Sequence, residues 1–185
     1  MLFRSRRGCI TICCTWDFIK GYDLTIIVSV MWAILSIRVE NKPGILFKVT
    51  NLFRARNFNI DSISVGVMEN PEFSKMTITT VGTEKKIAQI VKQLDKMIDT
   101  IEVKRLDEKE SVYKELVLFK IKSNGESDST EISKLAETHG AKIHNGEEGS
   151  LIAELTSTPD KIKVFEESMK PFGILDSART GVTAL

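Results

Sequence analysis

The stretch ILSIRVENKPGILFKVTNLFRARNFNIDSISV (residues 34–65) holds two strand patterns separated by a turn and a helix pattern. Apolar and polar side chains alternate over 37–40, which predicts a strand with one buried face. Apolar side chains then recur at helical spacing from 45 to 53, with Lys, Asn and Arg mostly on the other face. Alternation returns over 63–67. We therefore expect a sheet strand, a helix packed on that sheet, and a second strand.

The same kinds of pattern continue along the chain and then repeat. Asn70-Pro71 marks a turn before a third strand, Thr83 is placed to cap a second helix, and a fourth strand follows. After the charged segment RLDEKES (105–111), a predicted linker, the order strand–helix–strand–strand–helix–strand recurs, with its last strand over 174–182.

These patterns predict an α+β protein of two tandem ferredoxin-like βαββαβ domains, over residues 31–108 and 109–185. Each domain is expected to be a four-stranded antiparallel sheet with two helices on one face. Domains of this size bury little surface, and the other sheet face is left bare, which predicts that the sheets pair with something.

Residues 1–30 differ from the remainder and are treated as a separate N-terminal extension. They hold all three cysteines and a basic start, but charged residues interrupt the apolar run and no signal-peptide cleavage pattern follows. The uncharged run 24–37 is shorter than the ~20 residues that span a bilayer. Two interpretations stay open: translation begins at Met31, or the extension is disordered or loosely docked.

Composition and residue types exclude several classes of function. A formal net charge of +1 argues against a nucleic-acid binder driven by overall charge, and the clustered cysteines form neither a disulfide framework nor a zinc pattern. His139 is expected to be a solvated side chain near a helix dipole, and no nucleophile elbow, GxGxxG or P-loop is present. An RNA-binding sheet needs aromatic residues that the third strand, KMTITTV (75–81), lacks. We expect a soluble, cytoplasmic binding module without membrane or nucleic-acid partners.

The turn within ENKPGILFKV (40–49) suggests a ligand site. Pro43 pre-sets a helical φ, and Gly44 lets another group approach the backbone closely. The free N–H groups at 44–46 then form an anion site at the positive end of the helix, which a carboxylate fits. The Asn41 side chain can orient a polar neighbour such as an ammonium. The alternative is that Asn41 and Pro43 merely build a tight strand-to-helix turn.

The stretch 34–65 resembles the opening of an ACT domain, specifically that of the small regulatory subunit of acetolactate (acetohydroxyacid) synthase. The resemblance continues through ENPEFSKMTITTVG (69–82), KQLDKMIDTIEV (92–103) and the C-terminal SARTGVTAL (177–185), and covers about residues 31–185. Where that family commonly has an acidic or polar residue after the Asn, this chain has Lys42, which puts the ligand affinity in question.

This resemblance implies a subunit without activity of its own, which binds a catalytic subunit, raises its activity, and confers feedback inhibition by branched-chain amino acids, typically valine. Thiamine diphosphate, Mg and any FAD would belong to the catalytic partner, with no cofactor or metal in this chain. ACT domains of this kind form homodimers by pairing side by side into an eight-stranded sheet, with the ligand at the interface.

The resemblance also implies which residues hold the amino acid. Asn59 and Ile60 are expected at the start of the second strand. From one chain they would complete the ligand site that the turn within residues 40–49 forms in the other chain. Read by itself, Asn59 is equally a simple turn residue. Two other functions stay open: a free-standing ACT amino-acid sensor acting on another enzyme or regulator, and an enzyme in its own right. The ligand residues carried over by position are Asn41, Gly44, Ile45 and Leu46 of one chain with Asn59 and Ile60 of the other.

Overall fold

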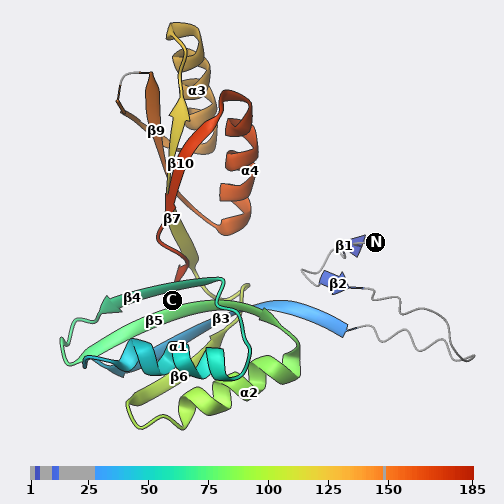
Figure 1. Ribbon diagram of the computed structural model, residues 1–185, viewed down its shortest axis with the longest axis vertical. Helices are drawn as coiled ribbons and strands as arrows, with labels where there is room; N and C mark the ends of the chain where they lie inside the picture. The colour runs from blue at the N-terminus through green and yellow to red at the C-terminus, as the bar shows by residue number, and fades with distance from the viewer. Residues whose placement is uncertain (1–2, 5–9, 13–27, 148) are drawn as a thin grey trace, which may run out of the picture. The chain divides into compact units, whose positions relative to one another are not determined.

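The computed structural model of the chain describes residues 3–4, 10–12, 28–147 and 149–185. It divides into two compact units, Met1–Ser111 and Val112–Leu185, so the boundary lies at the end of the predicted linker. Each unit has the order βαββαβ at its centre, with four antiparallel strands and two helices on one side of the sheet (Figure 1).

The first unit is built around its longest strand, which lies between two neighbours. Strand β3 pairs with β5 on one side and β6 on the other, and β4 lies outside β5. Ile37 of β3 stands opposite Met76 of β5 and Val103 of β6, which fixes the register of the three strands. The elements are β3 (Val28–Glu40), α1 (Ile45–Ala55), β4 (Ser62–Val67), β5 (Phe73–Gly82), α2 (Glu84–Asp95) and β6 (Thr100–Leu106).

The core of this unit lies between one sheet face and the two helices, which Figure 1 shows on the same side of the sheet. Alternate strand residues point to the opposite face. On that face Ile34 and Thr79, which are register partners, are 0% and 2% exposed, so the face without helices is not bare at its centre. The buried core residues are Ala33, Leu35, Ile37, Val39, Ile45, Val49, Phe53, Met76, Ile78, Ile87, Ile90 and Leu94.

The second unit repeats this plan, with β7 at the centre and the strand order β10-β7-β9-β8. Its core lies between the sheet and α3 and α4, and Phe119 and Phe165 meet in it with ring centroids 5.9 Å apart. The elements are β7 (Tyr113–Lys122), α3 (Glu126–His139), β8 (Lys142–Asn145), β9 (Ser150–Ser157), α4 (Pro159–Met169), the short 3-10 helix η1 (Lys170–Phe172), β10 (Ile174–Arg179) and β11 (Thr183–Ala184).

Helix boundaries follow the signals in the sequence more closely than the last strand does. The Thr83 hydroxyl accepts the N–H of Lys86 at the start of α2, and Gly140 ends α3 in the left-handed conformation with φ 72°. The single strand expected over 174–182 is wrong, because the chain turns at Gly181 (φ 78°). Strand β10 therefore stops at Arg179, and β11 pairs separately with the start of β7.

The N-terminal extension lies mostly outside the described residues. Its described parts are β1 (Phe3–Arg4) and β2 (Ile10–Ile12), which pair with each other, and β2 pairs with Val28–Val30 of β3. Strand β3 thus begins before Met31, and a translation start at Met31 stays a prediction. Among the described helices none has the length and apolar content needed to cross a bilayer.

Candidate functional site

The residues between β3 and α1 form a type II turn over Lys42–Ile45. Gly44 has φ 85° and ψ −6°, the conformation that the third position of this turn requires, and Pro43 occupies the second. The N–H of Ile45 donates to the carbonyl of Lys42 at 3.4 Å, so the expectation that this N–H is free for a ligand is wrong. Helix α1 begins at Ile45, so the interpretation that Pro43 provides the first helical φ is wrong. Pro43 instead stabilises the turn that leads into the helix.

Main-chain donors at this helix start are available to a ligand. Within the described part of the chain, the N–H groups of Gly44, Leu46 and Phe47 have no hydrogen-bond acceptor, and no side chain caps the helix. We call these three N–H groups the anion seat. A Cβ at Gly44 would meet nothing within 4 Å, so the approach to the backbone is open. Unpaired N–H groups and the helix dipole together favour an anion here.

Asn41 forms hydrogen bonds to the β4–β5 turn and to the start of β5. Its side-chain amide donates to the carbonyl of Pro71 at 2.9 Å and accepts the hydroxyl of Ser74 at 3.1 Å, and its main-chain N–H donates to Glu72 at 2.7 Å. These bonds tie the β4–β5 turn to the end of β3. An Asn side chain has two N–H donors and two acceptor lone pairs, so one of each is left to orient a ligand. Both interpretations of Asn41, as turn builder and as ligand group, are compatible with this arrangement.

The predicted hydrophobic contacts differ in exposure. The side chain of Ile45 is 2% exposed and belongs to the core, so only its main chain lies at the helix start. Leu46 is 45% exposed and Phe47 70% exposed, which places both side chains on the surface next to the anion seat. Phe47 was not predicted as a site residue. The signal that could have found it is an aromatic residue off the buried stripe of α1, which runs through Ile45, Val49 and Phe53.

Asn59 and Ile60 lie at the opposite end of α1 from the anion seat. They precede β4, which begins at Ser62, rather than opening it. The Asn59 side chain donates to the Asp61 carboxylate at 2.9 Å, and the main-chain carbonyl of Asn59 accepts the Thr80 hydroxyl at 2.6 Å. Ile60 packs partly buried against the core. Because α1 has 11 residues, its two ends are separated by about 16 Å. One chain therefore does not bring Asn59 and Ile60 to the anion seat.

Two lysines near the turn are paired with carboxylates. The Lys42 ammonium lies 2.6 Å from the Glu40 carboxylate, and the hydrogen bond to Glu40, with the attraction of its charge, raises the pKa of Lys42. The Lys48 ammonium lies 2.6 Å from Asp99. These exposed pairs reduce the positive potential of the two side chains, so the main-chain donors contribute most of the attraction for an anion.

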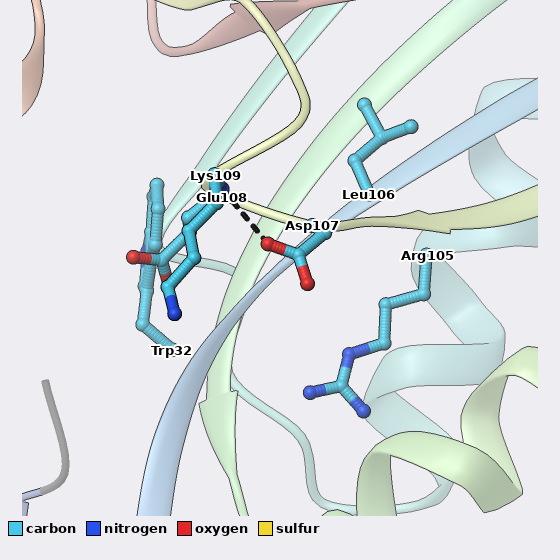
Figure 2. A pocket seen from close by; sticks show the side chains of 6 residues that line it. All are labelled: Trp32, Arg105, Leu106, Asp107, Glu108 and Lys109. Atoms are coloured by element: carbon cyan, nitrogen blue, oxygen red, sulfur yellow. Dashed lines mark hydrogen bonds between the residues drawn. The ribbon is translucent and has the colours of Figure 1, made fainter. Parts of the chain in front are cut away.

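The first unit also contains a cavity of about 370 Å³ near the N-terminal half of β3, lined by Trp32 and by residues 105–109 (Figure 2). Two of its polar side chains have hydrogen-bond partners. Arg105 donates to the Glu84 carboxylate at 2.6 Å, and Asp107 accepts the main-chain N–H of Lys109 at 2.8 Å. The side chains of Arg105 and Asp107 are therefore already paired.

Metal ligands and histidines are the other candidate groups in the part of the chain that the structure covers. There, no three His, Cys, Asp or Glu side chains are placed to hold a metal ion together. His139 is half-buried with its ring 5.4 Å from that of Phe165, so the expected solvated side chain is wrong, and His144 lies 2.9 Å from the Glu154 carboxylate.

Comparison with known proteins gives one consistent result. Residues 35–102 match the family model described as an AHAS small subunit-like ACT domain, and residues 114–185 match the one described as small subunit of acetolactate synthase. The chain is 40% identical over 151 residues to the "Probable acetolactate synthase small subunit" of Archaeoglobus fulgidus, covering 82% of this chain and 94% of that protein. It is 36% identical over 155 residues to the acetolactate synthase small subunit of Bacillus subtilis, covering 83% and 90%.

A solved structure agrees in both sequence and fold. The crystal structure of the acetolactate synthase small subunit from Thermotoga maritima has a TM-score of 0.76 and 35% identity, and covers 83% of this chain and 96% of that chain. Both predicted features, the tandem ACT-like ferredoxin-type domains and the family resemblance, are confirmed. The chain belongs to the family of acetolactate synthase small subunits.

Proposed function

We propose that this chain is the non-catalytic regulatory subunit of an acetolactate synthase. It binds the catalytic subunit, raises its activity, and makes it sensitive to feedback inhibition by a branched-chain amino acid, valine. The observation that carries the effector part is the anion seat: three unpaired N–H groups on an exposed helix start, reached over a glycine with open space around its Cα. Membership of the small-subunit family supports the choice of partner.

The carboxylate, the ammonium and the side chain of an amino-acid effector each have a partner at the anion seat or beside it. Its carboxylate accepts hydrogen bonds from the N–H groups of Gly44, Leu46 and Phe47, which are stronger than neutral ones because the acceptor is charged. Its ammonium is oriented by the remaining lone pair of the Asn41 carbonyl oxygen. Its apolar side chain packs against Leu46, whose side chain is 45% exposed beside the seat.

A homodimer completes this site. Among the described strands β4 pairs with β5 alone and forms one border of the sheet, and it exposes Val65 (45%) and Val67 (62%). Two β4 strands that pair antiparallel across a two-fold axis place the start of one against the end of the other. Since the end of β4 leads into the turn that Asn41 holds, Asn59 and Ile60 of a second copy then lie next to the anion seat.

The division of chemistry between the subunits follows from this proposal. The reaction, and with it the thiamine diphosphate, Mg and any FAD, belongs to the catalytic subunit. The small subunit contributes binding surfaces and a ligand-dependent interface. Effector binding changes activity only if the ligand has different affinity for the active and inhibited forms of the complex. An effector held between two small-subunit protomers meets that condition when inhibition alters their pairing.

The test is reconstitution with the catalytic subunit from the same organism. Acetolactate formation from pyruvate is measured with the catalytic subunit alone, with this chain added, and with valine added to both. We expect no turnover by this chain alone, stimulation in the mixture, and loss of that stimulated activity with valine. Absence of a complex on co-purification would contradict the proposal and favour a free-standing ACT amino-acid sensor.

A further inference from the structure

A second cavity, of about 300 Å³, lies in the second unit between the end of α3 and the first turns of α4. Thr138 and His139 line it from α3, Lys161 and Val164 from α4, and Leu155 from the end of β9. This volume is at the lower limit of the ~300–1,000 Å³ typical of small-molecule sites. Neither flanking acid, Glu137 or Asp160, is among the described residues that line it.

Two basic side chains face this cavity without a carboxylate. In the described part of the chain, Lys161 has no ion pair and the ring nitrogens of His139 have no hydrogen-bond partner, whereas His144 is paired with Glu154. The ring of His139 is held against the buried ring of Phe165, 5.4 Å away, so its position is defined by packing. A Lys ammonium and a His N–H that converge on one space favour an anionic ligand group.

The C-terminus of α3 opposes this attraction only weakly. The N–H of Gly140 donates to Glu137 at 3.0 Å and that of Ala141 donates to Ala136 at 2.8 Å. These bonds occupy main-chain carbonyl oxygens that would otherwise repel an anion at the helix end.

The remaining wall is apolar and in part exposed. Leu155 forms a buried floor at 4% exposure, and Val164 is 59% exposed on a helix whose other exposed positions are mostly charged. A solvent-facing Val beside a Lys gives the cavity one apolar and one cationic side. A bound molecule with both an apolar group and a carboxylate would remove Val164 from water and pair the two basic groups.

We propose that this cavity binds a small carboxylic acid with a short apolar group and no ammonium. An ammonium is disfavoured because the charge of the Lys161 ammonium repels it and no carboxylate lines the cavity to pair with it. The site is distinct from the anion seat in the first unit and does not depend on its assignment. The anion seat is expected to bind the acid that carries an amino group, and this cavity is expected to bind the acid that lacks it.

The test uses the full-length chain with isotope-labelled Leu and Val methyl groups. The chemical shifts of these methyl groups are measured by NMR while a small molecule is titrated into the protein. The probe is 3-methylbutanoate, and the matched controls are 3-methylbutan-1-ol, which lacks the charge, and valine, which adds only the ammonium. We expect the shifts of the Leu155 and Val164 methyl groups to saturate with the acid. Both controls should bind at least about tenfold more weakly than the acid. Lys161→Gln, a change at an exposed position, is expected to abolish the preference for the acid over the alcohol.

Three outcomes would overturn the proposal: equal binding of acid and alcohol, shifts of these two methyls that do not saturate, or an unchanged preference in Lys161→Gln. Addition of the catalytic subunit distinguishes the source of the carboxylate. If that subunit perturbs the Val164 methyl and excess 3-methylbutanoate reverses the effect, the carboxylate is carried by the partner protein. If it does not perturb the methyl while the acid still binds, the ligand is a free small acid. Both of these results support the site.

Discussion

Replacement of Gly44 by Asp tests the anion seat directly. The new carboxylate stands where the effector carboxylate should bind and competes for the same N–H groups. Loss of one charge-assisted hydrogen bond, at roughly 1.5–3 kcal/mol, weakens valine binding about tenfold to a hundredfold. Because Gly44 has φ 85°, a side chain there also costs about 1 kcal/mol of stability, although its Cβ meets open space. We expect a melting temperature of the first unit lower by about 4–8 °C and an intact fold.

The assay measures valine inhibition of the reconstituted enzyme and valine binding by calorimetry, with Gly44→Asn as the matched control. Asn has the same size and the same tolerance of positive φ but no charge. The Asp variant is expected to stimulate the catalytic subunit while losing most of its response to valine, and the Asn variant to retain more of that response. Normal valine inhibition of Gly44→Asp would place the effector elsewhere. Equal losses in the two variants would refute the assignment of the effector carboxylate to this helix start.

Three further predictions concern parts of the first and second units. Asn41→Ala removes the bonds that hold the β4–β5 turn and should lower the free energy of unfolding by about 1–3 kcal/mol in urea, with weaker valine binding; an unchanged midpoint would show that the turn is held by other contacts. Val67→Lys, on the border strand, should shift the sedimentation coefficient from dimer to monomer and abolish valine binding; a variant that stays dimeric would move the interface elsewhere. Arg179→Met leaves the buried Glu115 carboxylate without its ion pair and also removes the pair with Glu166; because the Arg179 side chain is 40% exposed, the cost should be about 1–3 kcal/mol. Lys170→Met, which breaks an exposed pair, should cost under about 1 kcal/mol, and similar costs would contradict the importance of burial.

The pH dependence of one exposed pair can be followed by NMR. The hydrogen bond from Lys120, with the attraction of its charge, lowers the pKa of Glu147. Its contribution to stability is therefore present above the ordinary Glu pKa and is lost as the pH falls through the lowered value. In Lys120→Met the Glu147 carboxyl should titrate at a higher pH than in the unaltered chain. An unchanged titration curve would show that the 2.7 Å contact is not maintained in solution.

The sequence alone was sufficient to predict features that depend on residues within one helix or strand. Alternation and helical spacing predicted the βαββαβ order in both units, because each strand and helix must turn its apolar side chains toward one core. Thr83 was also predicted as a cap from its residue type, and the end of α3 at Gly140 has an equally local cause. Thr83 bonds to a main-chain N–H three residues away, and Gly140 adopts a positive φ that other residues reach with difficulty. These interactions involve neighbours in the chain, so the residue types reveal them.

The candidate site depends on contacts between distant segments, and only the tertiary structure decided its form. The side chain of Asn41 bonds to a carbonyl 30 residues away, which no local pattern encodes. Ile45 and Phe47 are both apolar residues in the first turn of α1, yet the orientation of the helix on the sheet buries one and exposes the other. The main-chain carbonyl of Asn59 likewise accepts a hydroxyl 21 residues away, that of Thr80. Periodicity determines which elements form, because it depends on neighbours in the chain, whereas the packing of those elements determines which polar groups remain free to bind a ligand.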